Sequence, residues 1–292
     1  MSSTVFSKSR SAILLVHCND QKGLVAAITE FIAKNGGNIL SLEQHVDPHV
    51  NQFFMRVEWG LDGFAIPDDK IAEFFRVLIA ERNAMTFWLH FSDERLRMAV
   101  FVSKTSHCLY DIMSRVLAGE WQVDVPLIVS NHPDAEPIAK SFNTPFRHFP
   151  VLGDTRAEQE RLQIELLQEQ RIDLVVLARY MVIVGAPFIQ AFPQRMINIH
   201  HAFLPAFIGA KPYHRAYERG VKLIGATAHY VTEDLDEGPI IEQDVNRVSH
   251  LDSIDELTRK GFDVEKITLA RAIRRHLERK TLVFGNRVIV FD

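Results

Sequence analysis

The chain carries two stretches with the same layout, M-I-N-I-H-H-A-F-L-P-A-F-I-G-A-K-P-Y-H at 196–214 and G-A-T-A-H-Y-V-T-E-D-L-D-E-G-P-I-I-E-Q at 225–243. Each contains a short apolar run, at 196–199 and 226–231, that predicts a buried strand. Each run opens into a loop rich in polar side chains and proline. Ligands of open α/β sheets bind at such strand-to-loop edges, so both stretches predict one sheet with a functional site at this edge.

Two polar side chains of the first stretch predict catalysis. Asn198 and His200 occupy alternate positions of a strand and therefore point to the same face. An amide N–H there can stabilise an oxyanion while the imidazole accepts or gives a proton. A carboxylate is still needed to orient the imidazole or a water molecule, and Asp236 in the L-D-E-G-P turn is the candidate. His201 points the opposite way, which predicts a supporting or substrate-contacting role.

These motifs also resemble a known family. The N-I-H and L-P motifs with the downstream H-x-V-T-x-x-L-D-x-G-P-I-I resemble the folate-dependent formyltransferases, and the string at 204–241 is most similar to their deformylase branch. The resemblance implies hydrolysis of 10-formyltetrahydrofolate to formate and tetrahydrofolate. His200 and Asp236 would activate water, and Asn198 would stabilise the oxyanion. Folate is then the substrate, and we expect neither a cofactor nor a metal.

The resemblance also chooses between neighbouring carboxylates. Asp236 directly precedes the Glu-Gly-Pro turn and so takes the catalytic position. Asp234 and Glu233 are then expected to be solvated loop charges.

The resemblance further implies a pocket for the substrate. Leu174–Leu177 predicts a wholly apolar strand of a parallel sheet covered on both faces. The segment A-R-Y-M-V-I-V-G-A-P-F after it matches the family segment that holds the pterin ring, with Met181, Ile183 and Ile189 at matching positions. Lys211 and His214 are expected to touch the folate glutamate tail or to order their loop, and both alternatives stay open.

The sequence departs from the family pattern at a few positions. No glycine occurs at 103–108, where ribonucleotide formyltransferases cradle a substrate phosphate on backbone N–H groups, and this favours water as the acceptor. The other departures affect pterin contacts or loop hydrogen bonds; they are Val182, Val184, Gly185, Ala202 and Ile208.

The composition excludes several classes of protein. The 292 residues are 47% hydrophobic and 24% charged, with a formal charge of -4 and a pI near 6.4. This net charge and pI do not indicate a basic surface that would bind nucleic acid or an anionic membrane. Cys18 and Cys108 are the only cysteines and lie far apart, which excludes a disulfide framework and a C-x-x-C zinc site. A polar N-terminus without a secretory segment, and no run of ~20 apolar residues, predict a cytoplasmic protein.

The first 92 residues predict a separate small domain. Apolar strand and helix patterns alternate there in the order β-α-β-β-α-β, which is the ferredoxin-like arrangement. The string at 20–39 resembles an ACT domain, a regulatory module that pairs across subunits and often binds an amino acid. The resemblance implies a homo-oligomer and a methionine or glycine effector. The effector positions are Asn19, Asp20, Gly23, Gly37 and Asn38. The alternative is that the Asx residues among them only cap and turn the chain.

Residues 93–292 predict the catalytic domain, a doubly wound and mostly parallel α/β sheet. Near its end, Ser253 and Glu256 form a capping-box pattern for a helix, and the apolar spacing after it predicts a longer second helix. A hairpin is predicted at 283–288.

Three rival functions remain open. A formyltransferase that uses an amine would need a second substrate pocket near 103–108. A regulatory folate- or amino-acid-binding protein would have an inactive folate site, which the intact Asn198, His200 and Asp236 argue against. A zinc hydrolase would use His200, His201 and Asp236, but no H-E-x-x-H or comparable ligand spacing is present.

Overall fold

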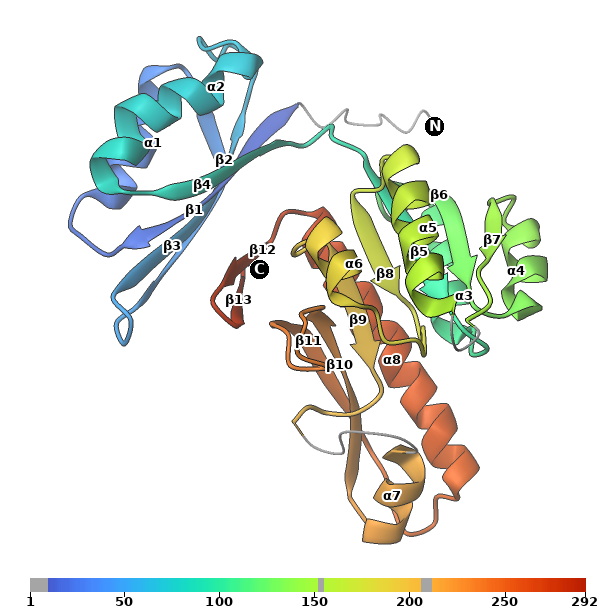
Figure 1. Cartoon of the computed structure of the whole chain (residues 1–292). Coiled ribbons are helices and arrows are strands. Elements are labelled where there is room, and N and C mark those ends of the chain that lie inside the picture. The colour runs from blue at the N-terminus through green and yellow to red at the C-terminus, as the bar shows by residue number, and fades with distance from the viewer. Residues whose placement is uncertain (1–9, 152–154, 206–211) are drawn as a thin grey trace, which may run out of the picture. The chain divides into compact units, whose positions relative to one another are not determined.

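A computed structural model describes residues 10–151, 155–205 and 212–292 of the chain. The chain forms two compact units (Figure 1). The first runs to Glu94 and includes Phe291–Asp292, and the second comprises Arg95–Val290.

The first unit is a four-stranded antiparallel sheet with two helices. Its elements are β1 Ser11–Asn19, α1 Leu24–Lys34, β2 Asn38–Asp47, β3 Gln52–Gly60, α2 Asp68–Phe75, the π-helical turn η1 Arg76–Ala80, the 3-10 turn η2 Glu81–Asn83 and β4 Thr86–Phe91. The strand order is β2-β3-β1-β4. The predicted ferredoxin-like fold is therefore confirmed.

Helix α1 buries four of the five residues of its apolar pattern. Leu24, Ile28, Phe31 and Ile32 lie at i, i+4, i+7 and i+8 and form one face, whereas Val25 of the same pattern is exposed. That face joins the alternate strand residues that point the same way, such as Leu14 and Val16 of β1, in one hydrophobic core. Period-2 strands and a period-3.6 helix thus share a single core.

The second unit contains a seven-stranded mixed sheet in the order β11-β10-β9-β8-β5-β6-β7. Its elements are β5 Leu96–Val102, α3 His107–Leu117, β6 Val123–Ser130, η3 Pro133–Ala135, α4 Glu136–Ser141, β7 Phe146–His148, α5 Arg156–Glu169, β8 Leu174–Leu177, α6 Ala186–Ala191, β9 Met196–His200, α7 Pro212–Arg219, β10 Leu223–Tyr230, β11 Ile240–Arg247, α8 Ile254–Leu277, β12 Thr281–Phe284 and β13 Arg287–Val290. Strands β5 to β9 pair in parallel, whereas β10 and β11 pair antiparallel. The predicted doubly wound, mostly parallel sheet is confirmed.

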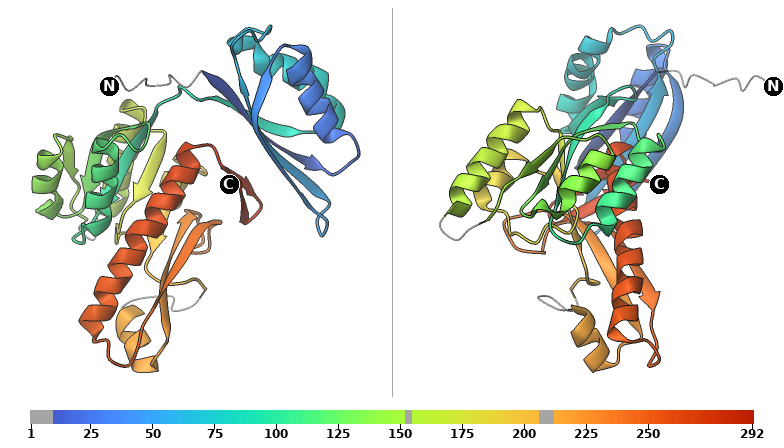
Figure 2. Two further views of the ribbon diagram at one scale, coloured as in Figure 1. Left: turned by 180° about the vertical axis from the view of Figure 1, so that it is seen from behind. Right: turned by 90° about the vertical axis from the view of Figure 1, so that its right-hand side faces the viewer.

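Helices cover both faces of this sheet (Figure 2). Met98, Val100 and Val102 of β5 face a core that includes α3 and α8. The alternate residues Ala99 and Phe101 face a second core formed with α5 and α6. Both faces of β5 are therefore buried, which explains its continuous apolar sequence.

The structure corrects one part of the helix prediction. A single helix, α8, replaces the two helices predicted after Ser253. Gly261 lies inside α8, and the helix continues through it. Tyr213 packs in the space that a side chain at this position would need: a Cβ on Gly261 would come within 2.1 Å of Tyr213 Oη. The short helices α4, α6 and α7 and strand β11 carry weak sequence signals and were not predicted.

Among the residues that the structure describes, no helix is both long enough and apolar enough to cross a membrane.

The predicted capping box begins α8. Glu256 N–H donates to Ser253 Oγ (3.3 Å), and Ser253 N–H donates to the Glu256 carboxylate (2.7 Å). We expect Ser253→Ala to lower the free energy of unfolding by about 1 kcal/mol, because it leaves a helix N–H group without its acceptor. Urea denaturation followed by circular dichroism measures the change. The control is Ser114→Ala inside α3, and equal stability of the two variants would contradict the prediction.

Candidate active site

The candidate site lies where the strand order of the second unit reverses. From β5 the chain continues to β6 and β7 on one side, and it returns to β8 and β9 on the other. The loops after β5 and β8 are joined there, since Ser103 N–H donates to the Arg179 carbonyl (3.2 Å) and Met181 N–H donates to Ser103 Oγ (2.9 Å). Open α/β sheets bind their ligands at this kind of switch point.

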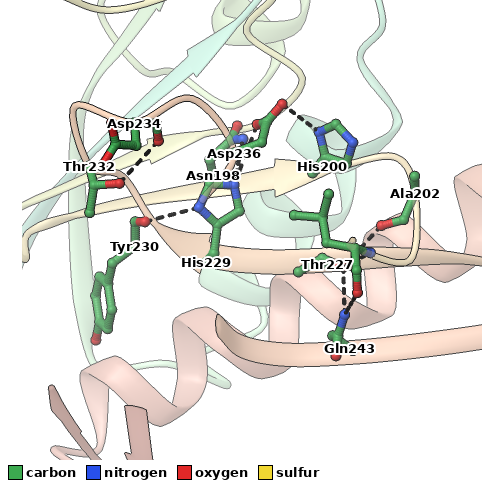
Figure 3. Close-up of polar contacts among 11 residues, drawn as sticks. Asn198, His200, Ala202, Thr227, His229, Tyr230, Thr232, Asp234, Asp236 and Gln243 are labelled. Carbon is green, nitrogen blue, oxygen red and sulfur yellow. Dashed lines mark hydrogen bonds and ion pairs between the residues drawn. The ribbon is translucent and has the colours of Figure 1, made fainter. Parts of the chain in front are cut away.

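The structure brings the three predicted catalytic side chains together (Figure 3). Asn198 and His200 come from β9, and Asp236 comes from the loop between β10 and β11. His200 Nδ1 lies 3.1 Å from Asp236 Oδ2. The side chain of His200 is 7% exposed and that of Asp236 is 16% exposed, so their contact is largely shielded from water.

A second histidine, His229, completes the cluster and was not predicted. Its Nδ1 lies 2.9 Å from the Tyr230 carbonyl oxygen, which can only accept, so Nδ1 carries a proton. Its Nε2 lies 3.2 Å from Asn198 Nδ2 and 3.6 Å from Asp236 Oδ1. His229 is the histidine of the H-x-V-T motif, but its place opposite Asn198 depends on the antiparallel register of β9 and β10.

The environment of Asp236 keeps its carboxylate ionised. Burial alone would raise the pKa of Asp236, but the hydrogen bonds and charges of His200 and His229 outweigh it and hold that pKa well below the ordinary value. A negatively charged carboxylate therefore faces His200 at neutral pH.

The loop that carries Asp236 is held close to β10. Asp236 adopts a left-handed backbone conformation with φ 59°. Two residues later, Gly238 approaches β10 so closely that a Cβ would stand 1.8 Å from the Tyr230 carbonyl oxygen. Only glycine fits there, which explains the E-G-P motif after Asp236.

The other ring nitrogen of His200, Nε2, is buried and has no hydrogen-bond partner among the described residues. His201 stacks on His200 with ring centroids 5.2 Å apart. Burial, followed by the charge of Arg179, lowers the pKa of His201 to about 4. His201 is therefore a neutral neighbour of His200 at neutral pH.

The loop after His200 is fixed by a buried hydroxyl on β10. Thr227 Oγ1 donates to the Ala202 carbonyl (3.0 Å) and accepts from the Leu204 N–H (3.0 Å) and from Gln243 Nε2 (3.0 Å). Gln243 Nε2 also donates to the Leu204 carbonyl (3.1 Å). This threonine-glutamine pair holds the loop through its backbone, so the anchoring does not depend on the side chain at Ala202.

A cavity of about 590 Å³ adjoins the catalytic side chains. Asn198, His200 and Asp236 line it, as do Met181 and Ile183, which are 60% and 53% exposed. His214 also lines it. Ile189 instead packs on the core formed by α5, α6 and the sheet. Lys211 and Ile208 lie outside the described residues.

The Gly185 departure is explained by a partner from α5. Glu160 Oε1 accepts from the N–H of Gly185 (2.9 Å), the residue at the start of α6 that has no side chain of its own to cap the helix. A Cβ on Gly185 would meet Glu160 Oε2 at 2.5 Å. Arg156 on the same helix donates to the Ile183 carbonyl. Helix α5 therefore holds the cavity loop 183–185.

His200, His201 and Asp236 do not bring their ligand atoms together as the zinc alternative requires. Among the described residues, the one group of His, Cys, Asp and Glu side chains with ligand atoms within 4.8 Å of one another is His107, Cys108 and Glu265. Arg179 Nε already lies 3.4 Å from the Glu265 carboxylate, so a cationic side chain stands beside that group.

The predicted effector residues do not meet within one ACT unit. Asn19, Asp20 and Gly23 precede α1, whereas Gly37 and Asn38 follow it. A helix of 11 residues separates the two groups by roughly 15 Å. Asn19 Oδ1 accepts from Gln52 Nε2 (2.5 Å), and Gly37 packs against Ile32 and Trp59. The effector site stays a prediction.

Comparisons with known proteins first define the class of this chain. Residues 96–273 match the formyl transferase family, and residues 12–73 match the ACT domain. The chain is thus an enzyme that combines an ACT domain with a formyltransferase fold.

The particular family follows from relatives that span the whole chain. A formyltetrahydrofolate deformylase of Synechocystis sp. is 51% identical over 96% of this chain and 98% of its own length. The one of Bacillus subtilis is 46% identical, over 96% of this chain and 93% of its own length. The crystal structure of the Pseudomonas syringae pv. tomato deformylase aligns with a TM-score of 0.95 at 42% identity, over 99% of this chain and 96% of that one. The chain belongs to the formyltetrahydrofolate deformylases and is a hydrolase, as the resemblance predicted.

The second unit alone is also similar to a transferase. Glycinamide ribonucleotide transformylase 1 of Symbiobacterium toebii aligns with a TM-score of 0.66 at 32% identity, over 70% of this chain and 97% of its own.

The close approach of Gly238 gives a test of the Asp236 loop. We expect Gly238→Ala to lower the rate of formate release by about 10²-fold, because a displacement of about 1 Å takes the carboxylate away from His200. Formate is measured enzymatically at saturating 10-formyltetrahydrofolate. Gly60→Ala is the matched control, since a Cβ there meets nothing closer than 4.0 Å. A fully active Gly238→Ala variant would refute the role of this contact.

Proposed function

We propose that this chain hydrolyses 10-formyltetrahydrofolate through His200, Asp236 and Asn198 without a metal ion. The observation that carries the proposal is the contact of His200 with Asp236 at 3.1 Å beside Asn198, at the wall of a cavity. An imidazole with an orienting carboxylate, beside an amide N–H donor, is the set of groups that water attack on a formyl group needs, and this supports the proposal.

Each side chain takes one part of the reaction. Asp236 orients His200, and His200 Nε2 removes a proton from the attacking water. The water oxygen bonds to the formyl carbon, and the resulting oxyanion accepts a hydrogen bond from the Asn198 amide. The bond from the formyl carbon to N10 then breaks, His200 returns its proton to N10, and formate leaves.

The apolar side of the cavity suits the pterin of the substrate. Met181 and Ile183 expose more than half of their surface beside the catalytic cluster. A flat aromatic ring that covers them removes apolar surface from water, which stabilises the complex. His214 remains the described candidate for the charged glutamate tail.

The ACT unit is proposed to bind a small amino acid, methionine or glycine, and to pair chains into a homo-oligomer. The two effector segments lie at opposite ends of α1, so one bound ligand can touch both only across two chains.

The direct test uses metal-stripped protein, 10-formyltetrahydrofolate and no amine. Formate and tetrahydrofolate in equal amounts, unaffected by a chelator, are expected. Turnover only with an added amine would establish a transferase. Bound folate without turnover would establish the regulatory protein.

Removal of the oxyanion donor gives the sharpest single-residue test. We expect Asn198→Ala to lower kcat by about 10²–10³-fold, because the tetrahedral intermediate loses a hydrogen bond that the ground state does not need. Folate binding, followed by fluorescence, stays close to that of the unmodified protein. Asn246→Ala on β11, outside the cavity, is the control. An unchanged kcat for Asn198→Ala would overturn the assignment.

Two aspartates in one loop provide a matched pair. We expect Asp236→Asn to lower kcat by roughly 10³–10⁴-fold, because an uncharged amide neither orients His200 nor stabilises its protonated form. Asp234 is exposed and does not line the cavity, so Asp234→Asn keeps full activity. Steady-state formate release compares the two, and equal losses would show that the loop rather than the Asp236 carboxylate matters.

A further inference from the structure

Two chemically different sets of side chains line the cavity. Met181, Ile183 and Leu235 are apolar, whereas Arg179, His201 and Tyr213 are polar. Arg179 and Tyr213 meet at Glu265, and the His201 ring centroid lies 6.4 Å from that of Tyr213, so we call these three the polar end. Because the pterin covers the apolar side chains in the proposed function, the nucleophile has to reach the formyl carbon from the polar end. The side chains of the polar end therefore decide which nucleophile is admitted.

Behind the polar end lies a buried group of four side chains, which we call the Glu265 network. Glu265 on α8 is completely buried. Tyr213 Oη donates to its Oε1 (2.5 Å), and His107 Nε2 lies 2.8 Å from its Oε2. Arg179 Nε lies 3.4 Å from the same Oε2. A hydroxyl and an imidazole therefore hydrogen-bond one carboxylate oxygen each, and the guanidinium forms an ion pair with one of these oxygens.

The Glu265 network is packed tightly against α8. The His107 ring stacks on Phe262 with centroids 4.0 Å apart and planes 10° apart. Tyr213 Oη fills the space beside Gly261. Helix α8 therefore fixes the positions of the His107 and Tyr213 rings.

The charge of the network matches its hydrogen bonds. Burial alone would raise the pKa of Glu265, but the hydrogen bond with His107 and the charge of Arg179 outweigh it and lower that pKa. The carboxylate is therefore ionised, yet its charge is already compensated by Arg179 and it offers no free oxygen to a substrate.

The same fold serves a different nucleophile in other enzymes. Glycinamide ribonucleotide transformylase 1 of Symbiobacterium toebii shares the fold of the second unit. A transformylase moves a formyl group to another molecule, so its active site has to admit more than water. The hydrolase needs a device that excludes amines, because an amine is a stronger nucleophile than water.

We propose that the Glu265 network is the element of the site that restricts the nucleophile to water. Its side chains His107, Arg179, Tyr213 and Glu265 fill and neutralise the polar end of the cavity. This inference rests on the proposed hydrolysis. With the network opened, an amine nitrogen bonds to the formyl carbon, the bond to N10 breaks, and the proton lost by the amine ends on N10. The same donor and the same catalytic side chains then give a formamide instead of formate.

The test measures how the product divides between formate and formamide. Full-length protein receives 10-formyltetrahydrofolate and an excess of glycinamide as the amine probe, and formate and N-formylglycinamide are quantified together. The unmodified protein is expected to release formate alone. His107→Ala and Tyr213→Phe are expected to raise the ratio of N-formylglycinamide to formate by at least about tenfold, the size of effect that one pocket contact has on selectivity.

The ratio does not depend on how much of the enzyme is folded, so a purely structural defect leaves it unchanged. Controls are His250→Ala and Tyr217→Phe, which make the same chemical changes at exposed positions. If His107→Ala does not fold, Tyr213→Phe decides, since it keeps the ring. Formate as the sole product of the folded variants overturns the inference, and so does a folded variant that makes neither product. If the unmodified protein itself releases no formate, the proposed function fails instead.

Discussion

The catalytic geometry depends on one constraint, the negative charge of Asp236 held between two imidazoles. A largely buried carboxylate is stable only with compensating partners, and His200 and His229 are those partners. Both histidines belong to neighbouring strands, β9 and β10, whose antiparallel pairing places Asn198 opposite His229. The Asp236 loop can reach both rings only because Gly238 lets it lie directly on β10. The sheet, the loop and the charge therefore depend on one another.

Prediction from sequence was most successful where a residue's position follows from local periodicity. The spacing of Asn198 and His200 places them on one face because strand side chains alternate. The amphipathic pattern of α1 likewise predicted its buried face, except that Val25 is exposed. Asp236 lies 36 positions beyond His200 in the chain, so its selection over Asp234 depended on family resemblance.

Other parts of the site depend on long-range packing and were not predictable. His229 meets Asn198 through a register that no local pattern encodes. Glu265 follows the apolar position Val264 in an amphipathic helix, where a charged residue usually indicates a solvated face, yet it is completely buried. Glu160 accepts a hydrogen bond from the Gly185 N–H although 25 positions separate the two residues in the chain. In each case the partner comes from a distant segment of the chain.

The continuity of α8 has a consequence for how this enzyme can vary. The helix is anchored by the Lys260–Asp252 and Arg275–Glu242 ion pairs, and Glu265 lies between these anchors. Insertion of one residue into a helix turns everything beyond it by about 100° and shifts it by about 1.5 Å. An insertion or deletion between the anchors would rotate Glu265 away from its three partners. Many single substitutions, in contrast, leave the position of Glu265 around the helix axis unchanged. The length of α8 between Lys260 and Arg275 is therefore expected to tolerate change less than its composition does.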